Sequence, residues 1–294
     1  MAQCSLCNNP AVIDNPLFCK EHFTIDFENR VFATIKEYNL IKESSKVAVA
    51  VSGGKDSLTV LTILNKQYPV TAILIDEGIA DYRDHTIEDM KRVCADKKIP
   101  YKIYSFKEYS GMTLNEMIQN GTSHPCSTCG TMRRQLLNIA SKEFDIIATG
   151  HNADDESQAI LMNIIRGNTE IFPRLGPSSG IHEHKEFVQR IKPLYFCTEK
   201  EIMTYAYLHN LIRGYNECPH AGKSYRSIVR DELNNYAQSH PAARKTLLKQ
   251  FLNFKSGLRV EQIPILKCTS CGEPSSSKVC RACLLLENIK INKH

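Results

Sequence analysis

The stretch that decides the fold covers Val47–Ser57 and reads Val-Ala-Val-Ala-Val-Ser-Gly-Gly-Lys-Asp-Ser. Its first five residues form a continuous apolar run, which is typical of a strand buried on both faces of a parallel sheet. The glycine pair lets the backbone approach a ligand closely, and a helix beginning there offers unpaired N–H groups to an anion. The stretch therefore predicts a phosphate-binding turn, although a bare glycine turn can also be purely structural.

Apolar and helical patterns alternate along the middle of the chain. Short runs rich in β-branched or aromatic side chains predict further strands at residues 70–75, 101–106 and 145–149. Helical patterns cover residues 24–41, 58–64 and 131–140. Thr198 and Glu201 have capping-box spacing, which predicts another helix start. This alternation predicts an α/β fold with a doubly wound parallel sheet and ligands at the carboxyl ends of its strands.

Length and charge set the broad class of protein. A chain of 294 residues can form one main domain with small appendages. No apolar run approaches a membrane span and no signal-peptide pattern opens the chain, so we expect a cytoplasmic protein without a membrane partner. Eight Lys and Arg residues from Lys223 to Arg259 face only Asp231 and Glu232, with Glu261 just beyond. That bias could bind a phosphate backbone, but on charge alone a solvated helix face is the favoured explanation.

Twelve cysteines are the strongest compositional signal. Most of them lie in C-x-x-C pairs, which in a reducing compartment points to metal ions. Two terminal groups have the spacing of closed zinc sites, and their members are Cys4, Cys7, Cys19 and His22, and Cys268, Cys271, Cys280 and Cys283. Both segments are too short for a core of their own, so metal binding should fold them. We therefore expect zinc modules at residues 1–23 and 261–294, flanking a domain at residues 24–260.

Three further cysteines do not fit this pattern. Cys126 and Cys129 form a C-x-x-C pair, and Cys218 lies far along the chain before a proline. They could form a redox dithiol that carries a persulfide, a third zinc site with His124 or His220, or an iron–sulfur cluster with one iron free of protein ligands. Spacing alone does not choose among these hypotheses. The two remaining cysteines, Cys94 and Cys197, are expected to be ordinary buried residues.

The string Ser-Gly-Gly-Lys-Asp-Ser at residues 52–57 resembles the PP-loop of the N-type ATP pyrophosphatases. It is not a Walker A loop, because Val49 stands where that motif requires glycine. The segment Gly-His-Asn-Ala-Asp-Asp at residues 150–155 is similar to one that PP-loop enzymes carry when they modify tRNA. The resemblance implies cleavage of ATP between its α and β phosphates, with AMP left on a substrate oxygen.

The PP-loop resemblance also implies roles for individual residues. The implied nucleotide-binding residues are Ala50, Ser52, Gly53, Gly54, Asp56, Ser57, Ile75 and Gly150. The glycine turn and its serines would hold the β and γ phosphates, Ala50 and Ile75 would frame the adenine, and Gly150 would lie near the ribose or α-phosphate. Asp155 would be the acidic catalytic group or would help to place Mg²⁺, which prefers carboxylate and phosphate oxygens.

Taken together, the terminal zinc motifs, the PP-loop and the three spare cysteines resemble the TtuA-like tRNA 2-thiouridine synthetases. This group includes archaeal NcsA and the eukaryotic cytosolic wobble-thiolation proteins. The resemblance implies that Cys126, Cys129 and Cys218 hold a 4Fe–4S cluster, alongside ATP, Mg²⁺ and two Zn²⁺. Arg133 matches a basic catalytic position that is lysine in some members. Arginine cannot act as a base at neutral pH, so we assign it charge stabilisation or contact with ATP.

The resemblance implies a tRNA sulfurtransferase that acts on a uridine, with wobble position 34 favoured. The uridine C2 oxygen would be adenylated, and sulfur would then replace it with release of AMP. The sulfur donor would be sulfide or a thiocarboxylated ubiquitin-like protein, and the chain would form a homodimer. Two alternatives stay open, a PP-loop 2-thiocytidine synthetase and a cluster-free thiolase that uses a persulfide. An inactive, RNA-binding zinc protein is disfavoured because Ser52, Asp56, Asp155 and all three spare cysteines are intact.

Overall fold

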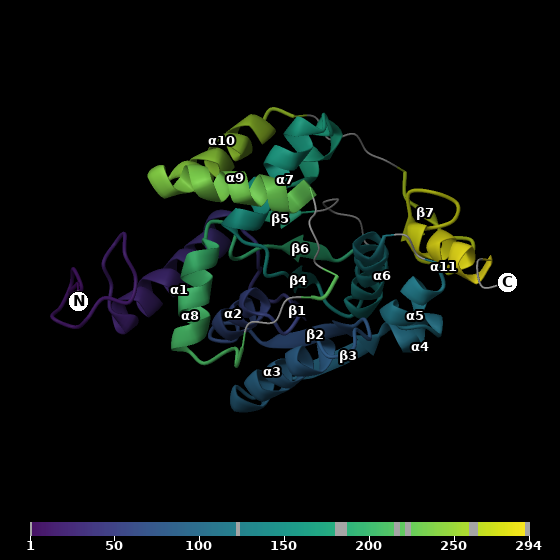
Figure 1. Ribbon diagram of the computed structural model, residues 1–294, viewed down its shortest axis with the longest axis horizontal. Helices are drawn as coiled ribbons and strands as arrows, with labels where there is room; N and C mark the ends of the chain where they lie inside the picture. The colour runs from purple at the N-terminus through teal and green to yellow at the C-terminus, as the bar shows by residue number, and fades with distance from the viewer. Residues whose placement is uncertain are drawn as a thin grey trace.

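The computed structural model describes residues 2–121, 124–179, 187–214, 218–220, 225–258 and 264–291. Its centre is a six-stranded sheet in the order β3-β2-β1-β4-β6-β5, parallel except for β5 (Figure 1). The strands are β1 (Val47–Val51), β2 (Val70–Asp76), β3 (Tyr101–Ser105), β4 (Ile146–Ala148), β5 (Ser178–Ser179) and β6 (Gln189–Ile191). The predicted α/β fold with a doubly wound, mostly parallel sheet is confirmed.

The strand order reverses between β1 and β4. From β1 the chain adds β2 and then β3 on one side, and it later returns to add β4 on the other side of β1. Val47 of β1 pairs with Val70 of β2 and with Ile146 of β4. In an open α/β sheet, a crevice forms at such a reversal beyond the carboxyl ends of the strands. The crevice here lies where Ser52 and Thr149 follow β1 and β4.

One face of the sheet is covered by four helices around the larger hydrophobic core. They are α1 (Lys20–Glu37), α2 (Lys55–Leu64), α3 (Arg83–Asp96) and α8 (Glu199–Leu208). Phe27 of α1 and Tyr205 of α8 are both fully buried, with ring centroids 5.1 Å apart. Burial of such large side chains fixes α1, and the N-terminal segment before it, against the sheet domain.

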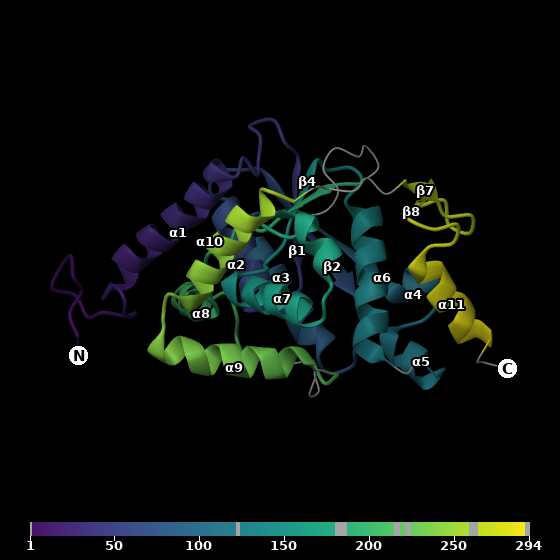
Figure 2. The ribbon, with the colours of Figure 1, turned by 90° about the horizontal axis from the view of Figure 1, so that it is seen from above.

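The opposite face carries α4 (Phe106–Ser110), α5 (Leu114–Gln119) and α6 (Pro125–Ala140), with α11 (Arg281–Ile291) packed against α6. A third cluster joins α7 (Ala153–Ile165), the short helix η1 (Thr169–Arg174), α9 (Tyr225–Ser239) and α10 (Ala243–Lys255). The C-terminal segment also holds the hairpin of β7 (Leu266–Lys267) and β8 (Pro274–Ser275). The N-terminal and C-terminal segments lie at opposite ends of the molecule (Figures 1 and 2).

Most predicted elements are present, with shifted ends. The strand at residues 47–51 is confirmed, and Thr198 caps α8 in a capping box with Glu201. α6 begins at Pro125 rather than at residue 131, because proline suits the first position of a helix. The helix predicted at residues 24–41 instead covers Lys20–Glu37. Among the described residues, no helix is long and apolar enough to cross a membrane.

Candidate active site

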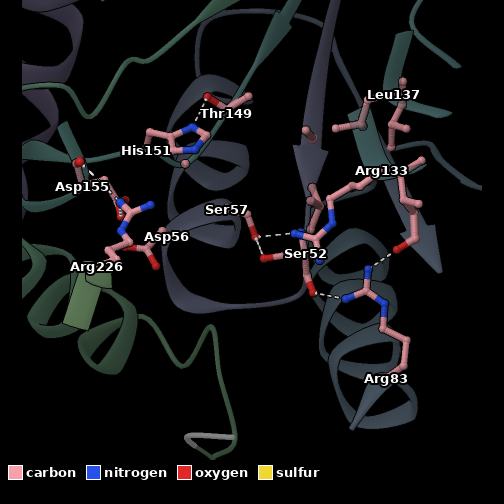
Figure 3. Close-up of a pocket in the computed structure, with 15 residues that line it drawn as sticks. Ser52, Asp56, Ser57, Arg83, Arg133, Leu137, Thr149, His151, Asp155 and Arg226 are labelled. Atoms are coloured by element: carbon pink, nitrogen blue, oxygen red, sulfur yellow. Dashed lines mark hydrogen bonds and ion pairs between the residues drawn. The ribbon is translucent and has the colours of Figure 1, made fainter. Parts of the chain in front are cut away.

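A pocket of about 280 Å³ opens beyond the carboxyl ends of β1, β2 and β4 (Figure 3). Eight of the residues singled out in the sequence line it, namely Ala50, Ser52, Asp56, Ser57, Ile75, Arg133, Gly150 and Asp155. Gly53 and Gly54 line a neighbouring cavity of about 210 Å³, which Ser52 and Asp56 share with the first. The glycine turn therefore separates two adjoining spaces, and its residues face both of them.

The backbone of the turn requires glycine at residue 53. Gly53 has φ of +82°, and a Cβ atom there would lie 2.1 Å from the carbonyl oxygen of Thr86. Ser57, in the first turn of α2, holds the turn from inside. Its Oγ accepts the Ser52 N–H at 3.1 Å and donates to the Gly54 carbonyl at 3.0 Å. The turn is thus fixed before any ligand enters, with the N-terminus of α2 directed at the site.

Gly150 allows the loop after β4 to pack against this turn. A Cβ atom at Gly150 would lie 2.8 Å from the backbone nitrogen of Ser57. The two loops that flank the strand reversal therefore touch at the start of α2. This close approach brings the Gly-His-x-x-Asp-Asp segment to the pocket, although it lies about a hundred residues beyond the glycine turn in the chain.

Asp56 and Asp155 form an acidic pair at one side of the pocket (Figure 3). Asn152 joins them, because its side-chain Nδ2 donates to Asp56 at 2.9 Å and it forms a capping box with Asp155 at the start of α7. Burial raises the pKa of both carboxyl groups; Lys55 opposes the shift at Asp56, and Arg226 opposes it at Asp155. Two neighbouring carboxylates offer the oxygen ligands that a divalent cation prefers.

Lys55 lies in the PP-loop but is held by protein carboxylates. Its Nζ is 3.0 Å from Asp56 and 2.9 Å from Glu199 at the start of α8. Although burial works to lower the pKa of Lys55, these carboxylates raise it above its ordinary value. The lysine is therefore a permanent cation beside the cavity that Gly53 and Gly54 line.

Two arginines of the pocket were missed in the sequence. Arg226 of α9 donates to Asp155 Oδ1 at 2.8 Å, and it falls within the basic stretch noted above. Arg83, at the start of α3, is buried, donates to the Ser52 carbonyl at 2.8 Å and also donates to the Ile75 carbonyl. Nothing in the sequence around Arg83 signals this role, because these two partners are backbone carbonyl groups.

A buried carboxylate ties Arg83 to Arg133. Glu77, which follows β2 and is fully buried, pairs with Arg83 Nε at 2.9 Å and with Arg133 Nη2 at 2.6 Å. The two guanidinium groups lie together on the side of the pocket opposite Asp155 (Figure 3). A buried charge is stable only when it is paired, so Glu77 holds both cations in place.

The cysteine trio adjoins the pocket through Arg133. Nη2 of Arg133 donates to Cys129 Sγ at 3.3 Å, one helical turn earlier on α6. Cys218 packs in the same apolar cluster as Cys129, and the Cys126 thiol donates to the His220 carbonyl at 3.4 Å. Cys126 is exposed, Cys218 half-buried and Cys129 buried, and burial raises the pKa of the Cys129 thiol while Arg133 opposes it. Of the three cysteines, Cys129 contacts a residue that lines the pocket, and Cys218 belongs to the same apolar cluster as Cys129.

The terminal cysteine groups have a different geometry. Within the described parts of the chain, two groups place all their ligand atoms within 4.8 Å of one another, and they are the two predicted at the termini. Cys7 and Cys19 sulfurs are 3.7 Å apart, and Cys271 and Cys280 sulfurs 3.8 Å. These distances match the edge of about 3.8 Å expected for a tetrahedron with Zn–S bonds of about 2.3 Å. The trio is not such a group, with or without His124 or His220.

Part of the basic stretch is used inside the protein. Arg244 pairs with Asp154 at 2.6 Å, and only 13% of its side chain is exposed. Lys245 and Lys249 of α10 line a separate cavity near α1. Lys223, Arg259 and Glu261 lie outside the described residues. The prediction of a docking surface on these helices thus does not fit Arg244, and it stays a prediction for the two lysines.

The sheet with its strand reversal and glycine turn defines the class of PP-loop nucleotide-binding proteins. In agreement, the PP-loop domain family matches residues 24–237. The chain is 37% identical to the cytoplasmic tRNA 2-thiolation protein 1 of Drosophila erecta and 33% identical to that of Anopheles gambiae, in each case over 97% of this chain and 87% of the relative. The chain belongs to the PP-loop family, within the group of the cytoplasmic tRNA 2-thiolation proteins 1.

A solved structure agrees with this placement. The U34-tRNA thiolase NcsA from Methanococcus maripaludis, solved with its [4Fe-4S] cluster, superposes with a TM-score of 0.82 at 33% sequence identity. The match covers 98% of this chain and 96% of NcsA. The predicted family resemblance is thereby confirmed, and it extends over the terminal cysteine segments as well as the sheet domain.

Proposed function

We propose that this chain is a tRNA sulfurtransferase that uses ATP to replace the C2 oxygen of a uridine with sulfur, at wobble position 34. The observation that carries the proposal is the place of Arg133. It lines the nucleotide pocket and donates to Cys129, so ATP and a sulfur-bearing trio can meet at one base. The relatives are named cytoplasmic, which agrees with the predicted location in the cytoplasm.

ATP would span the two adjoining cavities. Ala50 and Ile75 lie next to the last residues of β1 and β2, line the first cavity and would frame the adenine, while Gly150 would lie at the ribose or α-phosphate. The β and γ phosphates would follow the glycine turn into the second cavity, which Gly53, Gly54 and the Lys55 cation line. Backbone N–H groups at the start of α2 and this cation would stabilise the charge of the departing pyrophosphate.

Mg²⁺ would be held by Asp56 and Asp155, the acidic pair beside the expected α-phosphate. The uridine C2 oxygen attacks the α-phosphorus, the bond to the bridging oxygen breaks, and pyrophosphate leaves. A sulfur nucleophile then attacks C2, and the C2–O bond breaks with release of AMP. Arg133 and Arg83 face this reaction from the other side of the pocket and are suited to stabilise negative charge on the phosphate.

The trio would hold a 4Fe–4S cluster, which supplies an iron without a protein ligand where sulfur can bind. The donor set fits this group, because it offers three thiols that are less compact than a single tetrahedral zinc site requires. The half-open position of the trio would admit a base that has left its stack, which suits a nucleotide in a loop. The sulfur donor would be sulfide or a thiocarboxylated ubiquitin-like protein.

The terminal groups would each bind one Zn²⁺ and form modules at residues 1–23 and 261–294, on either side of the catalytic domain at residues 24–260. Their presence favours this assignment over a 2-thiocytidine synthetase, whose family lacks such modules. A cluster-free thiolase remains the second candidate, because the exposed Cys126 thiol could carry a persulfide. We also propose a homodimer, as the family resemblance implies.

The test uses the whole chain purified without oxygen and supplied with ATP, sulfide and tRNA. We expect iron in the protein, AMP in solution and 2-thiouridine in the digested tRNA by mass spectrometry. Cys218→Ala should lose iron and thiolation and keep both zinc ions. Cys94→Ser, which changes a buried cysteine away from the trio, should keep the iron, the thiolation activity and both zinc ions. Full thiolation without iron, in a parallel reaction supplied with a small-molecule persulfide in place of sulfide, would favour the persulfide route. Full activity in Cys218→Ala would reject the trio.

A further inference from the structure

A separate cavity, of about 460 Å³ and with four arginines in its lining, lies on another side of α6. α6 contributes Arg133 and Leu137 to the nucleotide pocket, and the next residue in each case, Arg134 and Asn138, to this second cavity. Its remaining walls come from the region of β6 and from the C-terminal segment beside α11. The arginine pocket, as we call it, is defined by Arg134, Arg174, Arg190 and Arg281.

These four arginines gather without acidic partners. None of them pairs with a carboxylate within the part of the chain that the structure describes; Arg190 donates to the neutral side-chain oxygen of Asn138 at 2.5 Å. Burial lowers the pKa of Arg134 and Arg190, and neighbouring guanidinium groups lower it further, Arg281 acting on Arg134 and Arg134 on Arg190. Like charges held together in this way are stabilised when an anion enters between them.

The C-terminal zinc group does not account for four cations. A zinc ion with four thiolates has a formal charge of about −2. Its sulfurs already accept from backbone N–H groups, at 3.2 Å for Cys268 and 3.4 Å for Cys280, and Gln135 lies 3.8 Å from Cys271. Among the described contacts, no arginine of the pocket donates to these sulfurs. A surplus of positive charge is left for a ligand.

The side chains that line the cavity favour phosphate as the ligand. Guanidinium groups present paired N–H donors that match phosphate oxygens, and the hydroxyl groups of Ser275 and Ser276 add neutral donors. The N-terminal residues of α11, Arg281 and Ala282, also line the cavity. Along α6, Arg134 lies eight residues beyond Cys126, which corresponds to about 12 Å of helix axis. A polynucleotide with one base at the trio would therefore have further phosphates within reach.

We propose that the arginine pocket binds backbone phosphates of the tRNA beside the target nucleotide. This inference rests on the proposed function, since it takes tRNA as the substrate. The pocket sets the position of the RNA without reading its bases, because phosphate contacts carry no sequence information. Arg281 belongs to the C-terminal zinc segment and Arg134 to the helix of Cys126 and Cys129, so bound RNA bridges the two.

The test measures the affinity of the full chain for a tRNA transcript by fluorescence anisotropy at several salt concentrations. The variant is Arg134→Gln with Arg281→Gln, two exposed side chains. The control, Lys36→Gln with Lys91→Gln, removes the same charge from exposed positions on α1 and α3, on the other face of the sheet. We expect the arginine variant to bind tRNA about tenfold more weakly and to lower the slope of log Kd against log salt by about 2, with the control near wild type.

Further measurements separate the possible failures. If the wild-type chain binds no tRNA, both the proposed function and this inference are rejected. Wild-type binding with unchanged affinity and salt slope in the arginine variant would reject the pocket alone. If inorganic phosphate binding is lost while tRNA affinity stays, the pocket takes free phosphate and the inference is wrong. Should zinc content fall, because Arg281 follows the ligand Cys280, Arg134→Gln with Arg174→Gln provides the same test away from the zinc ligands.

Discussion

Arg133 Nη2 lies 3.3 Å from Cys129 Sγ, and the same side chain lines the pocket of the glycine turn. The two residues are one helical turn apart on α6, so this contact follows from helix geometry alone. The aim of the guanidinium group toward the pocket depends on Glu77, which pairs with it at 2.6 Å. Three parts of the site are therefore connected. Arg133 links the thiol of Cys129 on α6 to the pocket, and the buried Glu77 holds Arg133 in place.

Glu77→Ala should strongly destabilise the protein. The change leaves Arg83 and Arg133 without their buried partner, which costs about 3–5 kcal/mol in the free energy of unfolding when a buried pair is broken. Urea denaturation measures it. Glu143→Ala, which breaks the exposed pair with Lys102, serves as control and should change the same free energy by at most about 1 kcal/mol. Equal effects of the two changes would contradict the role of Glu77.

Gly53→Ala should abolish ATP binding. A Cβ atom at this position would lie 2.1 Å from the Thr86 carbonyl oxygen, so the turn must move. Gly111→Ala is a matched control, since Gly111 has φ of +79° and no atom lies within 4 Å of its Cβ position. Both changes introduce backbone strain of about 1–3 kcal/mol, but only the first should remove nucleotide affinity in a calorimetric titration. Retained ATP binding in Gly53→Ala would show that the turn does not hold the phosphates.

The rate of AMP formation should fall at acidic pH, and the pKa of this fall should lie above 3.8, the ordinary value for an aspartate. Burial raises the pKa of Asp56 and Asp155, so protons bind them at a higher pH and displace Mg²⁺. Activity is then present above these pKa values and lost as the pH falls. The measurement is the rate of AMP formation against pH.

Arg226→Gln provides the matched variant for this profile. It removes the cation that opposes the shift at Asp155, so the acidic limb should move to higher pH. Burial and the Lys192 cation lower the pKa of His151 to about 4, so this residue is mostly neutral above that pH. An unmoved limb would exclude Asp155 as the titrating group.

Metal analysis should find one zinc ion in each terminal group. Cys7→Ser and Cys271→Ser should each remove one zinc ion, because each breaks one compact set of ligands. Cys197→Ser, at a fully buried cysteine outside both groups, should remove none. Loss of both ions from either single variant would mean that the groups do not bind metal independently.

Sequence patterns predicted the parts of the site that depend on local chemistry. The strand, glycine turn and helix at residues 47–57 were recognisable because their spacing is set by one backbone conformation. The terminal metal groups were recognisable for the same reason, since their ligands are close in the chain. Ser52, Asp56, Gly150 and Asp155 line one pocket, as expected of residues that follow the carboxyl ends of neighbouring parallel strands.

Long-range partners could not be predicted from sequence. Arg83 binds carbonyl groups at Ser52 and Ile75, and a bond to a backbone atom leaves no mark on the partner's residue type. Glu77 resembles any polar residue after a strand until the fold buries it between two guanidinium groups. The position of Cys218 depends on how the chain returns to α6 after α8, which no local pattern specifies.

The packing of α11 against α6 joins the far end of the chain to its reaction centre. Cys280 and Ala282 of the C-terminal segment share an apolar cluster with Cys129 and Met132 of α6. If that segment unfolds when it loses its metal, the helix that carries two of the three spare thiols loses a supporting wall. Scarcity of zinc would then reduce sulfur transfer even in cells with ample iron, ATP and tRNA.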